Sequence, residues 1–127
     1  MKLYHFTHPA KLPSITECGL VPFTPDVEFM TMGNAVVWLT TGKDDSGWIR
    51  PKERRATARR LTVRIEPANK RLAHFATWLR KQRGSFIGGN GRPGRYGDLI
   101  AYLPAGAEMN WYVYFGTIPP SKIDGLT

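Results

Sequence analysis

Two short β-type segments near the start of the chain, each with a pair of small polar side chains, constrain the fold most. Residues 1–7 alternate as a strand, which places His5 and Thr7 on one face. Residues 35–41 form a nearly continuous apolar run that ends in Thr40 and Thr41, as is typical of a buried strand. We expect these strand ends to line one cleft with their hydrogen-bonding groups.

The segment between the two strands predicts a helical turn followed by a loop. Leu12, Ile15 and Cys18 recur at three-residue spacing, which indicates one face of a short helix over residues 14–18. Gly19 follows and is expected to end that helix in the left-handed conformation. Residues 23–34 mix turn-forming and apolar residues, and we interpret them as a loop that covers a cleft.

The remainder of the chain alternates between strand and helix patterns. Residues 61–65 alternate as a strand, and residues 111–118 predict the last strong strand. Residues 68–83 predict the clearest helix, with one apolar stripe. Its members are Leu72, Phe75, Ala76 and Leu79. Residues 98–103 fit either a short strand or a helix.

Length and composition favour one globular domain over residues 1–127. The expected class is α+β, with a split, mostly antiparallel sheet of about six strands and the 72–79 helix against one side. No apolar run approaches the roughly 20 residues of a membrane span, and no signal peptide is apparent. Together with the single cysteine, Cys18, this predicts a cytoplasmic protein without membrane contact.

The charge of the chain points to a polyanionic partner. The net charge is +8, and arginines cluster over residues 50–60 beside an aromatic residue. Arginine with a neighbouring aromatic ring suits phosphate contact and base stacking, so nucleic acid is the expected partner. The candidate residues are Trp48, Arg50, Arg54, Arg55, Arg59, Arg92 and Arg95. The alternative is a basic, solvated surface without a specific partner.

Metal chemistry has no support in the residue pattern. The lone cysteine and three histidines lack the spacing of a ligand set, so we expect no metal site.

The glycine-rich residues 88–91 lack the lysine and spacing of a P-loop, and we interpret them as a mobile surface loop.

The order of several short pieces resembles the ADP-ribosyltransferase superfamily, above all its DNA-modifying toxins and the related RNA 2′-phosphotransferases. The pieces are Tyr-His-Phe-Thr at residues 4–7, the helix and Gly19-Leu20 within residues 12–22, and the strand at 36–41. Residues 111–123, with Ile-Pro-Pro at 118–120, are similar to the closing strand and exit of the same group.

The resemblance implies a cleft in which NAD is clamped between two strands of the split sheet. His5 would grip the cofactor with Thr7 as a neighbouring donor. Trp38, Thr40 and Thr41 would shape the nicotinamide pocket. The alternatives are that His5 is a core histidine whose hydrogen bonds are made within the protein, and that Thr40 and Thr41 are simply the polar end of a buried strand.

The chain departs from the family at the catalytic glutamate, which would stabilise positive charge at the ribose as nicotinamide leaves. That position falls near Asn110 or Trp111, and neither is acidic. Glu108 is the nearest carboxylate, and Asn110 offers a hydrogen bond but no negative charge. Glu108 fits a plain exposed loop carboxylate equally well.

Two functions follow from the resemblance. The first is an NAD-dependent mono-ADP-ribosyltransferase that acts on a nucleic-acid or protein acceptor, as a bacterial toxin or a phage-encoded modifier would. The alternative is a catalytically inactive module of the same fold that binds a nucleotide or nucleic acid, and the departure at the glutamate favours it.

Overall fold

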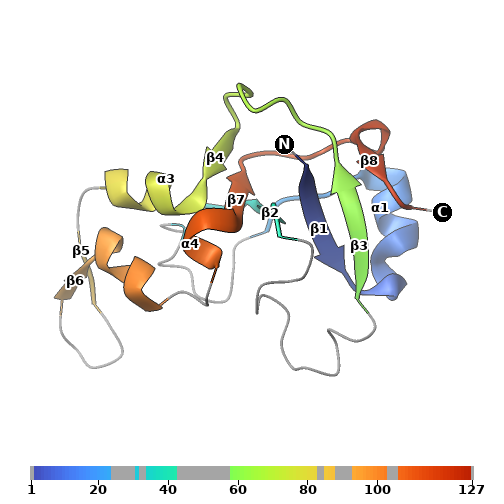
Figure 1. Ribbon diagram of the computed structural model, residues 1–127. Helices are drawn as coiled ribbons and strands as arrows, with labels where there is room; N and C mark the ends of the chain where they lie inside the picture. Colours follow the sequence, from blue (N-terminus) through green and yellow to red (C-terminus); the bar gives the residue numbers. More distant parts are fainter. Residues whose placement is uncertain are drawn as a thin grey trace.

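A six-stranded sheet forms the centre of the molecule in the computed structural model, which describes residues 2–23, 31, 34–42, 58–82, 85–87, 93–102 and 106–126 (Figure 1). Its strand order is β4-β7-β2-β1-β3-β8, and every neighbouring pair is antiparallel. The strands are β1 (Leu3–Thr7), β2 (Val37–Thr40), β3 (Arg59–Val63), β4 (Leu72–His74), β7 (Trp111–Tyr114) and β8 (Ile123–Asp124). The prediction of an α+β chain with an antiparallel sheet is confirmed.

Short helices flank the sheet at its two ends (Figure 1). The α-helices are α1 (Leu12–Cys18), α3 (Phe75–Lys81) and α4 (Ala107–Asn110). The 3₁₀ helices are η1 (Pro9–Lys11), η3 (Tyr96–Tyr102) and η4 (Pro120–Lys122), and a small hairpin joins β5 (Ser85–Ile87) to β6 (Pro93–Arg95). Residues 98–103, which fitted either strand or helix, therefore belong largely to a 3₁₀ helix. Within the described residues, no helix has the length and apolar character needed to cross a membrane.

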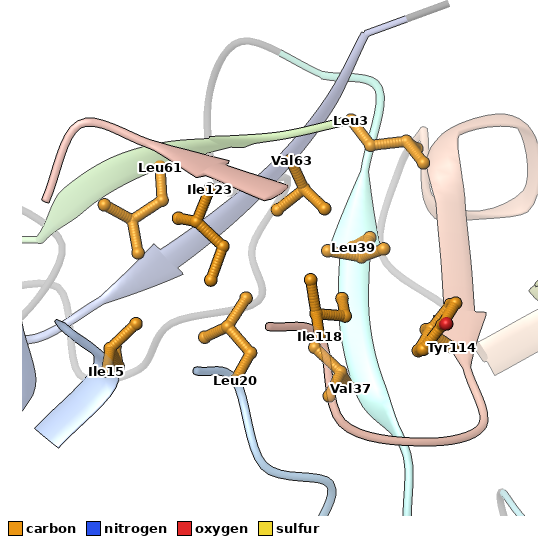
Figure 2. Close-up of a cluster of buried hydrophobic side chains, with 10 residues drawn as sticks. All are labelled: Leu3, Ile15, Leu20, Val37, Leu39, Leu61, Val63, Tyr114, Ile118 and Ile123. Carbon is orange, nitrogen blue, oxygen red and sulfur yellow. The ribbon is translucent and has the colours of Figure 1, made fainter. Parts of the chain in front are cut away.

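Two hydrophobic clusters cover the two faces of the sheet. In β2 the side chains alternate, so Val37 and Leu39 join one cluster while Trp38 joins the other. Figure 2 shows the first cluster, in which strand side chains are directed toward Leu20 and Ile118. The second cluster packs Phe75 and Leu79 of α3, among others, against β2 and β7. Both faces of β2 are thus buried, which explains its unbroken apolar sequence.

The helix predicted over residues 68–83 begins later than expected. Residues 72–74 form β4, and the helix runs only over Phe75–Lys81. Leu72 lies opposite Tyr114 of β7 and packs on the first cluster, whereas the fully buried Phe75 and Leu79 belong to the second. Pairing with β7 gives the backbone of residues 72–74 partners outside the helix, so tertiary structure overrides the helical pattern.

Gly19 ends α1 with a positive φ, as predicted, but its ψ is extended rather than helical (φ 80°, ψ −167°). This conformation turns the chain so that Leu20 and Ile118 exchange two backbone hydrogen bonds of 2.9 and 3.0 Å. A Cβ atom at Gly19 would lie 2.1 Å from the carbonyl oxygen of Ile118. Glycine is therefore required here both for its φ and for close backbone approach.

We expect Gly19→Ala to lower the free energy of unfolding by about 2–3 kcal/mol, because the new methyl group collides with backbone and the positive φ is strained. Gly125→Ala is the matched control. Gly125 also has a positive φ, yet its Cβ would meet its nearest neighbour at 3.5 Å, an ordinary contact. Urea unfolding measures both variants. Equal losses in the two variants would contradict the steric collision.

Candidate functional site

Backbone pairing in the sheet is shortest between its two central strands. All five residues of β1 pair with β3, and β2 pairs with β7 from Val37 to Thr40. Between β1 and β2, in contrast, only Tyr4 pairs with a residue of the other strand, Thr40, and both strands are fully described. The backbone ladder therefore stops at Tyr4, and the following residue of β1 begins the opening.

His5 is the residue at which the two strands part. Its Nδ1 atom lies 2.8 Å from the backbone carbonyl oxygen of Trp38 in β2. A carbonyl oxygen only accepts hydrogen bonds, so Nδ1 carries the proton and donates it. In the neutral ring Nε2 is then an acceptor. The His5 side chain thus bridges β1 and β2 at a place where longer strand pairing would have a backbone hydrogen bond.

The environment of His5 favours the neutral imidazole. Burial lowers the pKa of His5 below its ordinary 6.5, and the nearby positive charge of Lys11 lowers it further. The hydrogen bond to Trp38 opposes both effects. We conclude that the ring is neutral at physiological pH.

A groove of about 830 Å³ opens beside His5, within the range of roughly 300–1,000 Å³ common for small-molecule sites. Its polar lining residues are His5, Thr7, His8, Lys11 and Ser14. Its apolar lining residues include Phe6, Ile15, Leu20, Val21, Phe23 and Val37. The two residues predicted from the first strand, His5 and Thr7, thus meet in one groove, and no carboxylate is among its described lining residues.

The residues predicted from the second strand lie elsewhere. Trp38 is buried on the opposite face, with its ring edge-on to Phe75 and Trp111 at centroid distances of 4.8 and 5.6 Å. Thr40 is fully buried, and its hydroxyl accepts a hydrogen bond from the Gly42 amide at 3.0 Å. Within the described part of the groove, β2 contributes Val37 and the carbonyl that holds His5.

Thr41 and Asn110 form a polar pair just past the end of β2. The Thr41 hydroxyl donates to Oδ1 of Asn110 at 3.0 Å, and the Thr41 amide donates to the Asn110 carbonyl at 3.0 Å. Tyr4 lies opposite Thr40. Along the strands, the Thr41–Asn110 pair lies on one side of these two residues and the His5 groove lies on the other side. Strand alternation also places the Thr41 and His5 side chains on one face of the sheet.

Glu108 is not among the described lining residues of the groove. It is an exposed residue of α4, and its carboxylate accepts a hydrogen bond from Nη2 of Arg80 on α3. His74, which no motif had singled out, holds the same helix: its Nε2 lies 3.0 Å from the Met109 carbonyl and donates to it. These contacts fasten α4 to α3 and β4, and α4 ends at Asn110.

The predicted nucleic-acid residues fall mostly on parts of the chain that the structure does not describe. Trp48, Arg50, Arg54, Arg55 and Arg92 lie outside the described residues. Arg59 is exposed on β3 and donates to the Gly125 carbonyl at 3.3 Å. Arg95 is exposed at the end of β6. The basic surface thus remains a prediction.

Lys11 and Phe23 are among the groove residues that sequence reasoning did not single out. Lys11 ends a 3₁₀ turn that is closed by the bond from its amide to the His8 carbonyl at 3.0 Å. Phe23 is half exposed and lies in an extended segment bonded to Val36. Neither position belongs to a periodic pattern, so spacing carried no signal for them.

No family model matches this chain, and no curated protein or solved structure matches it. Its function is therefore inferred from the groove, the sheet opening and the residues around them.

We expect Lys11→Met to raise the pKa of His5, because it removes a positive charge that disfavours the imidazolium. NMR titration of the ring protons measures the change, and Lys81→Met on α3 is the control. A His5 pKa that moves equally in both variants would contradict a specific effect of Lys11.

The lowered pKa of His5 also predicts a pH dependence of stability. Between the folded-state pKa and 6.5 the unfolded chain binds more protons than the folded chain, so the free energy of unfolding falls as the pH falls through this window. His5→Gln is expected to weaken this dependence. Urea unfolding of both proteins at several pH values tests it, and identical slopes would contradict the prediction.

Proposed function

We propose that this protein binds NAD in the groove beside His5 and transfers its ADP-ribose to an acceptor. The observation that carries the proposal is the opening between β1 and β2, with a neutral His5 bridging it and a ligand-sized groove at its side. The resemblance of the chain to ADP-ribosyltransferases leads to the same arrangement, a nicotinamide dinucleotide clamped between two strands of a split sheet.

The chemistry of His5 suits such a ligand. The Trp38 carbonyl fixes the tautomer, and the neutral ring presents Nε2 as an acceptor for a hydroxyl donor such as a ribose 2′- or 3′-OH. Thr7, which also lines the groove, adds a hydroxyl that both donates and accepts. A neutral imidazole can hydrogen-bond a sugar hydroxyl without adding positive charge to the groove.

In the proposed reaction the bond between C1′ of the ribose and the nicotinamide nitrogen breaks, and its electron pair leaves with nicotinamide. A nucleophilic atom of the acceptor then bonds to C1′ and loses its proton. The Thr41–Asn110 pair at the far end of β2 is the candidate partner of the ribose in this step. An amide orients a hydroxyl by hydrogen bonding but supplies no negative charge, so we expect slow turnover.

The acceptor is nucleic acid rather than protein on the balance of charge, since the chain carries a net charge of +8. Transfer to labelled DNA, RNA and protein, compared at low and high salt, tests this choice. Nucleic-acid modification that weakens steeply with salt is the expected result.

A second candidate is a binding module without catalysis. Two observations favour it: the described groove lining holds no carboxylate, and Glu108 is paired with Arg80. The module would bind the same nucleotide in the same groove and leave it intact.

NAD is expected to raise the melting temperature of the protein, and nicotinamide release is expected to follow with time. His5→Ala should weaken both effects by at least about tenfold in affinity or rate, because it removes a hydrogen bond to a buried polar group and the acceptor for the sugar. Glu17→Gln, an exposed change on α1, is the control. Stabilisation by NAD without nicotinamide release supports the binding module; no stabilisation and no release contradict both candidates.

Asn110→Glu is expected to accelerate nicotinamide release by about tenfold or more, because it places a carboxylate beside Thr41, near the position where the resemblance implies a catalytic glutamate. Asn110→Gln is the matched control, and Glu108→Gln should leave the rate within about twofold because Glu108 is engaged with Arg80. Rates that rise equally in the Glu and Gln variants, or that collapse in Glu108→Gln, would contradict the assignment of Asn110.

A further inference from the structure

Asn110, the candidate partner of the ribose, is held by hydrogen bonds on both sides of its Cα atom. Its own amide donates to the Gly106 carbonyl at 3.0 Å, and its carbonyl accepts from the Thr41 amide, also at 3.0 Å. The peptide before Asn110 is held a second time at its carbonyl, because Nε2 of His74 lies 3.0 Å from the Met109 oxygen. Both peptides that flank Asn110 are therefore fixed in place.

The Asn110 side chain has a defined orientation on this backbone. Its Oδ1 atom accepts from the Thr41 hydroxyl at 3.0 Å. Its Nδ2 atom lies over Gly106, where a Cβ atom would come within 3.3 Å of it, closer than an ordinary contact. Glycine thus leaves the amide the space it occupies, and a small shift of α4 would move the whole group.

His74 is itself fixed in orientation and in tautomer. The Met109 carbonyl only accepts, so Nε2 carries the proton. In the neutral ring Nδ1 is then an acceptor, and the Thr77 hydroxyl, 2.8 Å away, donates to it. Tyr112 lies opposite His74 in the sheet, and its ring packs edge-on against the imidazole at a centroid distance of 5.1 Å.

We propose that His74 is a positioning residue for the Thr41–Asn110 pair and that Thr77 sets the tautomer this role requires. His74 acts through the Met109 peptide and not on the ribose itself. The inference rests on the proposed function, because it assigns a support to the pair that we place beside the ribose. An amide supplies hydrogen bonds without charge, so its effect depends on geometry held constant while the bond to nicotinamide breaks.

The ion pair between Arg80 and Glu108 provides the matched control. It also joins α3 to α4, yet both side chains are about half exposed, at 51% and 55%, and such pairs contribute little to stability. Arg80→Gln therefore loosens the same two helices without touching the Met109 carbonyl. A variant of His74 should disturb Asn110 in a way that Arg80→Gln does not.

NMR tests the positioning without reference to activity. At mildly alkaline pH the His74 ring should carry its proton on Nε2, and Thr77→Val should increase the population of the other tautomer. The amide nitrogen of a glutamine can take the place of Nε2, whereas that of an asparagine takes the place of Nδ1. His74→Ala and His74→Asn should thus shift the Asn110 side-chain resonances and speed exchange of the Thr41 amide by about tenfold, and His74→Gln should keep exchange within about threefold of wild type.

Nicotinamide release from NAD is measured on the same variants. His74→Ala should lower kcat by about tenfold and leave KM for NAD within about twofold, because the groove beside His5 is unchanged. His74→Gln should retain kcat within about threefold, and Arg80→Gln should leave kcat and KM within about twofold.

Three results would overturn the inference: a proton on Nδ1 of His74, no recovery in His74→Gln, or an effect of Arg80→Gln on Asn110 as large as that of His74→Ala. Unchanged kcat in His74→Ala, with the Asn110 resonances displaced, would remove the pair from the reaction and the inference with it. A wild-type protein that releases no nicotinamide would contradict the transfer activity, and the NMR comparison would still decide whether His74 positions the pair.

Discussion

The hydrogen bond from His5 to the Trp38 carbonyl is the interaction on which the site depends. Where β1 and β2 part, the backbone carbonyl of Trp38 would lose its ladder partner, and an unpaired buried carbonyl is costly. The imidazole satisfies that carbonyl in place of a backbone amide. The same side chain therefore joins the two strands beyond the end of their backbone pairing and borders the groove.

The short pairing between β1 and β2 joins β4-β7-β2 to β1-β3-β8, so the cohesion of these two halves of the sheet rests largely on side chains. The first hydrophobic cluster supplies this cohesion. Leu3 and Leu61 come from one half, Leu39 comes from the other, and Leu20 and Ile118 pack with them (Figure 2). The bridge between Leu20 and Ile118, which Gly19 permits, thus supports the core beside the opening.

The sequence pattern predicted both β1 and the doubly buried strand β2, but only the alternation of β1 indicated which side chains share a face. The alternation of β1 correctly placed His5 and Thr7 together. The unbroken apolar run of β2 gave no such guidance, so Trp38 was expected at a cleft although it belongs to the opposite core. The apolar stripe that starts at Leu72 spans a strand edge and a helix, which local spacing cannot separate. Lys11 and Phe23 are positioned by hydrogen-bonded turns and a distant bridge, and neither leaves a pattern in the sequence.

The charges around the groove set a limit on its chemistry. A neutral His5, the Lys11 ammonium and the lack of a carboxylate in the described lining favour binding an anionic nucleotide over stabilising a cation. Such binding energy is equal in the ground and transition states and does not accelerate bond cleavage. Acceleration requires a group that interacts more strongly as the ribose becomes positive, and the Thr41–Asn110 pair at the other end of β2 is the described candidate. Binding and catalysis are therefore assigned to opposite sides of the Tyr4–Thr40 pair, and a dinucleotide serves both only by reaching across that pair.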